Sequence, residues 1–234
     1  MRATLRSLTV LCVVLMCGNT VWAQTSITLA ADADTSIREN WPDEERSSRV
    51  LECRSYNYQD ISGRQQIPYI RFDLRVLQDA PPTGAVFSIV KTVDSRGYAA
   101  GQVRVYGLKD DFGNTPQAWL DSGLTYNTSG WEVPGDDNGG TQDIDTNRVV
   151  YIADLPAAAT SYVEETLSIS NSPALDAFVS NRWANGGLAT LMFVQEFAVN
   201  RTLYFNNTEN TDLAPPTLEV TGLLQGLPAD TVAP

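Results

Sequence analysis

Short segments in which apolar and polar residues alternate constrain the fold of this chain more than any other feature. The segment from Ile67 to Leu74 places apolar side chains on one face of an extended chain and Tyr69, Arg71 and Asp73 on the other. A period of two is that of a half-buried β-strand. The same pattern, interrupted by turn-forming residues, recurs in nine further segments: Ser26 to Ala30, Val50 to Cys53, Ala85 to Val93, Gly101 to Leu108, Val149 to Ala153, Val163 to Ile169, Leu188 to Phe197, Arg201 to Asn206 and Pro216 to Thr221. About ten strands predict an all-β protein folded as a two-sheet β-sandwich.

One short helix is expected near the C-terminal third of the chain. The Ser172 hydroxyl can cap it, and Pro173 occupies the first helical position, where proline is tolerated. The run from Asn185 to Gly187 ends it. Its apolar stripe consists of Leu175, Phe178, Val179 and Trp183. A stripe of this kind indicates a structural helix packed against the sandwich.

The N-terminal residues have the pattern of a secretory signal peptide, with a basic start, an apolar centre from Leu8 to Met16 and a small-residue exit at Ala23. We therefore expect residues 1–23 to be a signal peptide, residues 24–221 to form the sandwich domain and residues 222–234 to be a flexible tail or linker. No stretch approaches the roughly 18 apolar residues that a spanning helix needs. We expect a protein secreted to the extracellular space or the cell surface, without membrane insertion.

Composition argues against several classes of function. The formal net charge is −12, whereas nucleic acid and anionic lipid both demand a basic surface. We therefore do not expect either as a partner. The sequence contains no histidine, which supplies the base of most serine and cysteine triads and the usual ligands of zinc. Cys53 is the one cysteine beyond the expected signal peptide, so an intramolecular disulfide is not expected.

Five segments, taken in order, resemble the DNRLRE-domain proteins, which are related to the disaggregatase repeat and to family 96 carbohydrate-binding modules. Ala31 to Arg38 (ADADTSIR) is similar to the family's opening strand, and Ile67 to Leu74 (IPYIRFDL) to its arginine-phenylalanine-aspartate-leucine strand. Gln102 to Asp111 (QVRVYGLKDD) and Gly123 to Asn127 (GLTYN) resemble the next two motifs. Phe205 to Val220 resembles the closing pattern, which ends in a Pro-x-Leu-x-Val strand.

The resemblance covers nearly all of the chain beyond the expected signal peptide. It implies a jelly-roll-type β-sandwich that serves as a binding module, and some members of the family recognise alginate-like acidic polysaccharide. This sequence departs from the family in two loops that look expanded, Glu39 to Arg46 and Gly113 to Leu120, and in lacking a clear Trp-x-Glu before the GLTYN segment.

Aromatic residues in or beside the expected loops are candidates for ligand binding, because the C–H face of a sugar ring packs on tryptophan or tyrosine. The candidates are Trp41, Tyr58, Trp119 and Trp131. The alternative is that each ring turns back into the core and anchors its loop.

Two arginines are further ligand candidates, because a guanidinium can hold a uronate carboxylate through two hydrogen bonds. Arg71 lies on the polar face of its expected strand, and Arg104 could join it on one sheet surface. Cross-strand pairing with Asp73 or Glu209 is the alternative.

Acidic residues suggest structural calcium, which takes six to eight oxygen ligands. The resemblance brings the first and last strands together, so Asp32, Asp34 and Glu209 could hold an ion with backbone carbonyls. A second acidic cluster, from Asp136 to Asn147, could form an irregular calcium loop or a plain solvated loop.

The sequence thus predicts an extracellular, non-catalytic module that binds carbohydrate, with acidic polysaccharide as the partner and calcium as a structural cofactor. The alternative is a surface or matrix protein that serves adhesion and has no dedicated sugar site. Hydrolysis of polysaccharide by a pair of carboxylates needs no histidine and is a third, less favoured possibility.

Overall fold

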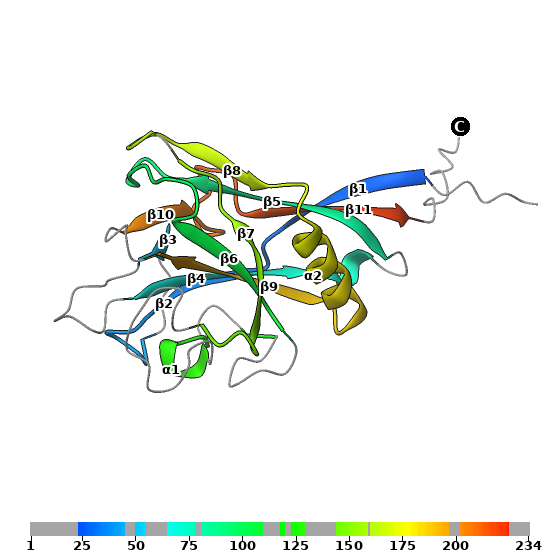
Figure 1. Ribbon diagram of the computed structural model, residues 1–234, viewed down its shortest axis with the longest axis horizontal. Coiled ribbons are helices and arrows are strands. Elements are labelled where there is room, and N and C mark those ends of the chain that lie inside the picture. The colour runs from blue at the N-terminus through cyan, green and yellow to red at the C-terminus, as the bar shows by residue number, and fades with distance from the viewer. Residues whose placement is uncertain are drawn as a thin grey trace, which may run out of the picture.

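Two antiparallel sheets packed face to face form the body of the protein (Figure 1). The computed structural model describes residues 23–44, 50–54, 65–77, 81–109, 118–119, 123–129, 144–158, 160–196 and 202–224. The predicted all-β, two-sheet sandwich is confirmed. No helix in these ranges is both long and apolar enough to cross a membrane.

Sheet A has six strands, in the order β1-β11-β5-β10-β3, with β8 paired to the other edge of β5. Its strands are β1 (Ala23–Ala30), β3 (Val50–Cys53), β5 (Pro82–Lys91), β8 (Glu165–Ile169), β10 (Leu203–Asn206) and β11 (Thr217–Leu224). The first and last strands pair directly along their whole length, from Ala23 opposite Leu224 to Ala30 opposite Thr217.

Sheet B has five strands, in the order β2-β4-β9-β6-β7. Its strands are β2 (Ala33–Arg38), β4 (Gln66–Asp73), β6 (Val103–Leu108), β7 (Val149–Asp154) and β9 (Leu188–Gln195). All ten strands expected from alternation are present, most of them with shifted ends, and β2 is the additional one. The chain passes from sheet A to sheet B between β1 and β2, where Ala31 N–H donates to Pro216 O and Asp32 N–H to Arg71 O, both at 3.0 Å.

An aromatic chain runs through the core between the two sheets. Phe72, Phe87, Phe193 and Phe205 follow one another in edge-to-face contacts with centroid distances of 6.1, 5.6 and 5.8 Å. All four side chains are fully buried. Edge-to-face pairs of this kind are worth roughly 0.5–1.5 kcal/mol each beyond their buried area, so this chain ties sheet A to sheet B.

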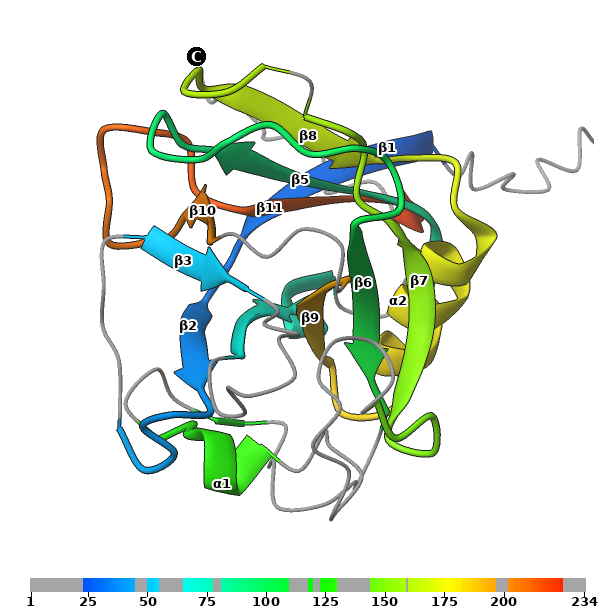
Figure 2. The same cartoon turned by 60° about the vertical axis from the view of Figure 1, so that its left-hand side comes forward.

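The expected helix is present as α2 (Pro173–Ala184), which packs on one side of the sandwich against β5, β7 and β9 (Figure 2). Ser172 caps it by accepting a hydrogen bond from Leu175 N–H. The Asp176 carboxylate accepts a hydrogen bond from Ala85 N–H at 2.7 Å, which ties the first turn to β5. Trp183 packs against the core while remaining partly exposed.

The outer face of sheet B carries a second apolar cluster instead of meeting solvent. Residues of all five strands of sheet B pack there with Trp119, Leu124 and Ile144, which come from the segment between β6 and β7. The cluster contains Ala33, Ile37, Ile67, Tyr69, Tyr106, Leu108, Trp119, Leu124, Ile144, Val149, Met192 and Val194. A single-turn helix, α1 (Tyr126–Ser129), lies beside it (Figure 1), and a 3₁₀ turn, η1 (Leu74–Leu77), follows β4. Consequently β4 and β9 are buried on both faces.

Candidate functional site

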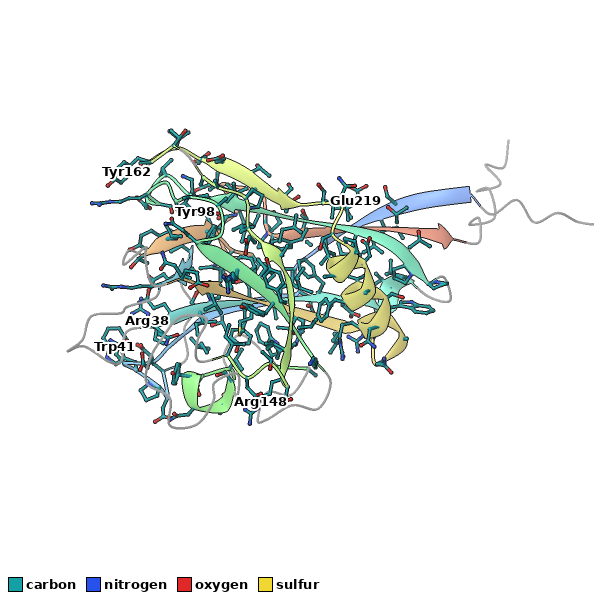
Figure 3. All side chains as sticks on the ribbon, in the orientation of Figure 1. Arg38, Trp41, Tyr98, Arg148, Tyr162 and Glu219 are labelled. Atoms are coloured by element: carbon teal, nitrogen blue, oxygen red, sulfur yellow. The ribbon has the colours of Figure 1, made fainter. Side chains whose placement is uncertain are left out.

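The turn after β2 presents an exposed tryptophan whose ring lies on a buried cation (Figure 3). Trp41 is 49% exposed, and the Arg38 guanidinium carbon lies 5.0 Å from its ring centroid. Arg38 is itself only 8% exposed and forms an ion pair with Glu52 of β3. We call Arg38, Trp41 and Glu52 the Trp41 rim. Since one side of the ring faces Arg38, the exposed part of the ring is available to a ligand.

The local sequence explains why the Trp41 rim is held in place. Along β2, Ser36 and Arg38 point toward sheet A, where Ser36 Oγ accepts a hydrogen bond from Glu52 N–H at 2.7 Å. After Arg38 the chain turns, with Trp41 N–H donating to Arg38 O at 3.3 Å. Glu39 fastens the turn to β4 through a 3.1 Å hydrogen bond from Gln65 N–H. The exposed ring therefore sits on a base fixed to both sheets.

The charge around the Trp41 rim is mixed. Asp43 and Glu44, two and three residues after the tryptophan, are exposed, and Glu39 is half-buried. Asn127 of α1 donates to the Asp43 carboxylate at 2.7 Å, and its backbone N–H donates to Pro42 O at 3.1 Å. The turn is thus joined to α1, and its surface offers an apolar ring beside hydrogen-bond acceptors.

A second exposed surface lies on the outer side of β6 and β7, where Arg104 is placed between two carboxylates. Arg104 lies 3.0 Å from Glu196 and 3.8 Å from Asp154, and 41% of its side chain is exposed. Burial works against the charge of Arg104, but its hydrogen bond with Tyr106 and the nearby carboxylates outweigh burial and raise the pKa of the guanidinium. Tyr151, 47% exposed, donates to Asp154 at 2.9 Å. We call these five residues the Arg104 patch.

Arg71 and Trp119, both predicted as ligand contacts, hold each other on the covered face of sheet B. The Arg71 guanidinium makes hydrogen bonds of 3.1 and 2.8 Å to Asp32, donates to Trp119 O, and lies 5.3 Å from the Trp119 ring centroid. Trp119 is 2% exposed, and its indole N–H donates to Thr190 Oγ1 at 3.1 Å. The loop-anchoring alternative therefore describes Trp119, and the cross-strand partner of Arg71 is Asp32 rather than Asp73 or Glu209.

The structure does not describe every residue that the sequence predicts as a ligand contact. Tyr58 and Trp131 lie outside the described residues, as does most of the acidic segment from Asp136 to Asn147. Arg38 and Tyr151 were missed by sequence reasoning. Arg38 could have been found only from the pairing of β2 with β4, which turns its side chain inward, and Tyr151 from the alternation of β7.

The acids predicted to bind calcium have other partners. Asp32 pairs with Arg71, the buried Asp34 accepts a hydrogen bond from Thr208 N–H at 2.8 Å, and Glu209 accepts one from Asn207. The expected approach of the first strands to the Glu209 loop is thus seen at Asp34. Within the described ranges, however, no group of three or more acidic, cysteine or histidine side chains is arranged to hold a metal ion. Calcium binding stays a prediction.

Neither a family model nor a curated protein matches this sequence. The resemblance to DNRLRE-domain proteins therefore stays a prediction.

Proposed function

We propose that this protein is an extracellular, non-catalytic carbohydrate-binding module and that the Trp41 rim is its main contact with sugar. The observation that carries the proposal is the half-exposed Trp41 ring resting on the buried, ion-paired Arg38. An exposed indole costs hydrophobic free energy unless a partner covers it. A ring held by its supporting cation loses little conformational freedom when a sugar stacks on it.

Acidic polysaccharide is the proposed ligand class, on the strength of the family resemblance and the Arg104 patch. A partly exposed guanidinium can receive a uronate carboxylate, and the neighbouring Tyr151 offers an aromatic face. Glu196 and Asp154 compete for the same cation. We therefore propose that the Arg104 patch selects among acidic sugars, while the Trp41 rim supplies stacking that does not depend on charge.

Adhesion through a protein contact is the alternative that a specific observation favours. Tyr162 is 57% exposed at the same end of the sandwich as Trp41 (Figure 3), and Val93 and Val163 are 46% and 48% exposed. Tyr162 adopts a left-handed backbone conformation with φ of 58° and accepts a hydrogen bond from Arg96 at 2.9 Å. Exposed aromatic and arginine side chains are enriched at protein interfaces, so this tip would serve a matrix or surface protein.

A polysaccharide array, probed with and without calcium, tests the proposal. We expect binding to one polysaccharide class, and Trp41→Ala should weaken it about fivefold or more because an aromatic contact contributes roughly 1 kcal/mol or more. Trp41→Phe should retain part of the affinity. Val76→Ala, which removes a 54% exposed apolar side chain from η1, is the matched control and should bind as the parent does.

Three outcomes would contradict the proposal or a part of it. Absence of binding to every polysaccharide class on the array favours an adhesion protein. Release of reducing or unsaturated ends from an acidic polysaccharide favours an enzyme. Equal binding by Trp41→Ala and the parent would remove the Trp41 rim from the contact.

A further inference from the structure

A cavity of about 340 Å³ lies between α2 and the ends of β6 and β7, outside the surfaces described above. Five apolar residues and three polar residues line it: Leu108, Val150, Ala174, Ala177 and Phe178, with Lys109, Asn181 and Arg182. Known ligand pockets begin at roughly 300 Å³ and are mostly apolar with a few polar groups. The cavity has this size and this chemistry.

Small residues on the helix create the hollow. Ala174 and Ala177 lie one turn apart on the side of α2 that faces β7, where larger side chains would fill the space. Phe178, one turn beyond Ala174, packs its ring against Gly107 of β6. An added Cβ at Gly107 would lie 2.6 Å from Phe178 Cδ2. The helix therefore stays anchored by Phe178, while the half-buried Ala174 and the exposed Ala177 leave an open pocket beside it.

The charge of the lining is opposite to the charge of the chain. Among the residues that the structure describes, Lys109 and Arg182 are the charged members of the lining and none is acidic, although the chain as a whole carries a net charge of −12. Arg182 is 1% exposed and is fixed by hydrogen bonds to Leu188 O at 2.7 Å and Asn185 O at 3.0 Å. Lys109 is positioned by a 2.8 Å hydrogen bond to Thr146 O. Two fixed cations beside an apolar wall favour an anion that carries a hydrophobic group.

We propose that this cavity binds a small amphiphile with a short alkyl or aryl group and a carboxylate head. An apolar cavity of roughly 150 Å³ is enough for benzene, so about twice that volume accepts a ring with a short chain. The apolar group lies among Leu108, Val150 and Phe178, and the carboxylate faces Lys109. In Figure 1, α2 lies away from the turn that carries Trp41, so the two sites are separate.

Saturation-transfer NMR of the full secreted chain with 3-phenylpropionate tests the proposal. We expect a dissociation constant on the order of 1 mM, typical of so small a ligand. Ala177→Leu fills the cavity and should weaken binding at least tenfold, while Ala184→Leu, an exposed alanine outside the lining, should bind as the parent does. Lys109→Gln, which keeps a donor for Thr146 O, should weaken binding of the carboxylate about threefold or more.

The neutral analogue 3-phenylpropanol separates charge from shape. It should bind the parent more weakly than the carboxylate does and should not distinguish Lys109→Gln from the parent. The proposal is overturned if the parent gives no saturation transfer, if Ala177→Leu binds as well as the parent, or if the alcohol binds as tightly as the carboxylate. Trp41→Ala should leave this binding intact, so failure here and failure of sugar binding are distinguishable.

Discussion

The contact between Gly107 and Phe178 shows how one missing side chain sets the position of a helix. A Cβ at residue 107 would lie 2.6 Å from Phe178 Cδ2, closer than packed carbon atoms approach. The ring cannot swing away easily, because Phe178 is 5% exposed and belongs to the core between the sheets. The absence of a side chain at this position of β6 is therefore a packing requirement.

Gly107→Ala should lower the free energy of unfolding by about 1–3 kcal/mol, because it overpacks the contact under α2. The matched control is Gly84→Ala in β5, where an added Cβ meets nothing nearer than Thr221 Cβ at 3.9 Å. That variant should be neutral or slightly stabilising. Urea unfolding followed by circular dichroism measures both. Equal stability of the two variants would mean that Phe178 moves aside without cost.

The sequence could not predict the surroundings of a site residue where segments far apart in the chain form them. Alternation correctly placed Arg71 and Tyr69 on the face of β4 opposite to Phe72, but it assigned that face to solvent. The cover is Trp119, whose carbonyl accepts from Arg71 across a separation of 48 residues. Nothing in the local pattern of β4 encodes that contact. Trp41, in contrast, is exposed, which is one of the two alternatives that the sequence left open, and the short turn that carries it is fixed by neighbouring residues.

At the scale of elements, the N-terminus of α2 does two structural tasks through one hydroxyl. Ser172 Oγ accepts a hydrogen bond from Leu175 N–H at 3.2 Å and donates one to Ile152 O of β7 at 3.1 Å. The first bond caps the helix, and the second satisfies a carbonyl at the edge of sheet B. Because α2 also covers this edge, β7 is protected from pairing with another chain.

Ser172→Ala should lower the free energy of unfolding by about 1–2 kcal/mol, through loss of the cap and of the bond to Ile152 O. Ser172→Asn keeps a capping oxygen and should recover part of that loss. Chemical unfolding followed by circular dichroism measures the free energy of unfolding of each variant. Ser170→Ala, at an exposed position just outside the helix, is the control. A loss confined to Ser172→Ala supports the cap, and equal loss in both serine variants contradicts it.

Most elements were predictable, because each strand but one carries its own alternation. The exception, β2, has the sequence ADTSIR and buries Asp34, Ser36 and Arg38 on its inner side. These polar side chains are acceptable inside because Thr208 N–H, Glu52 N–H and the Glu52 carboxylate meet them. The hydrophobic pattern alone cannot identify such a strand. The motif order of the family resemblance did so.

On the scale of the whole molecule, sheet B is the middle of three layers, with sheet A on one side and the second apolar cluster on the other. Each core buries titratable groups. Burial raises the pKa of the Tyr69 and Tyr98 hydroxyls and of the Cys53 thiol far above their ordinary values. Burial lowers the pKa of the Lys91 ammonium, although Glu165 opposes the shift.

The directions of these four pKa shifts decide whether the free energy of unfolding rises or falls as pH increases. A group whose pKa is higher in the folded protein stabilises it fully below the unfolded pKa and loses that contribution as pH rises, by about 1.4 kcal/mol per pH unit. The loss begins near pH 8.5 for Cys53 and near pH 10 for the two tyrosines. Lys91 acts in the opposite direction, because the unfolded chain holds its proton up to about pH 10.4. Cys53 and the two tyrosines lower the free energy of unfolding as pH rises, and Lys91 alone raises it. The free energy of unfolding should therefore fall in alkaline solution.

Tyr98→Phe should make this alkaline decline shallower by about 1.4 kcal/mol per pH unit above pH 10, because one linked proton is removed. At neutral pH the substitution should cost little, since the buried Tyr98 hydroxyl has no hydrogen-bond partner in the part of the chain that the structure describes. Phe87→Leu is the control, because it removes core volume without removing a titratable group and should lower stability equally at every pH. Urea unfolding at a series of alkaline pH values measures the slopes. An unchanged slope in Tyr98→Phe would mean that this hydroxyl ionises as readily in the folded protein as in the unfolded chain.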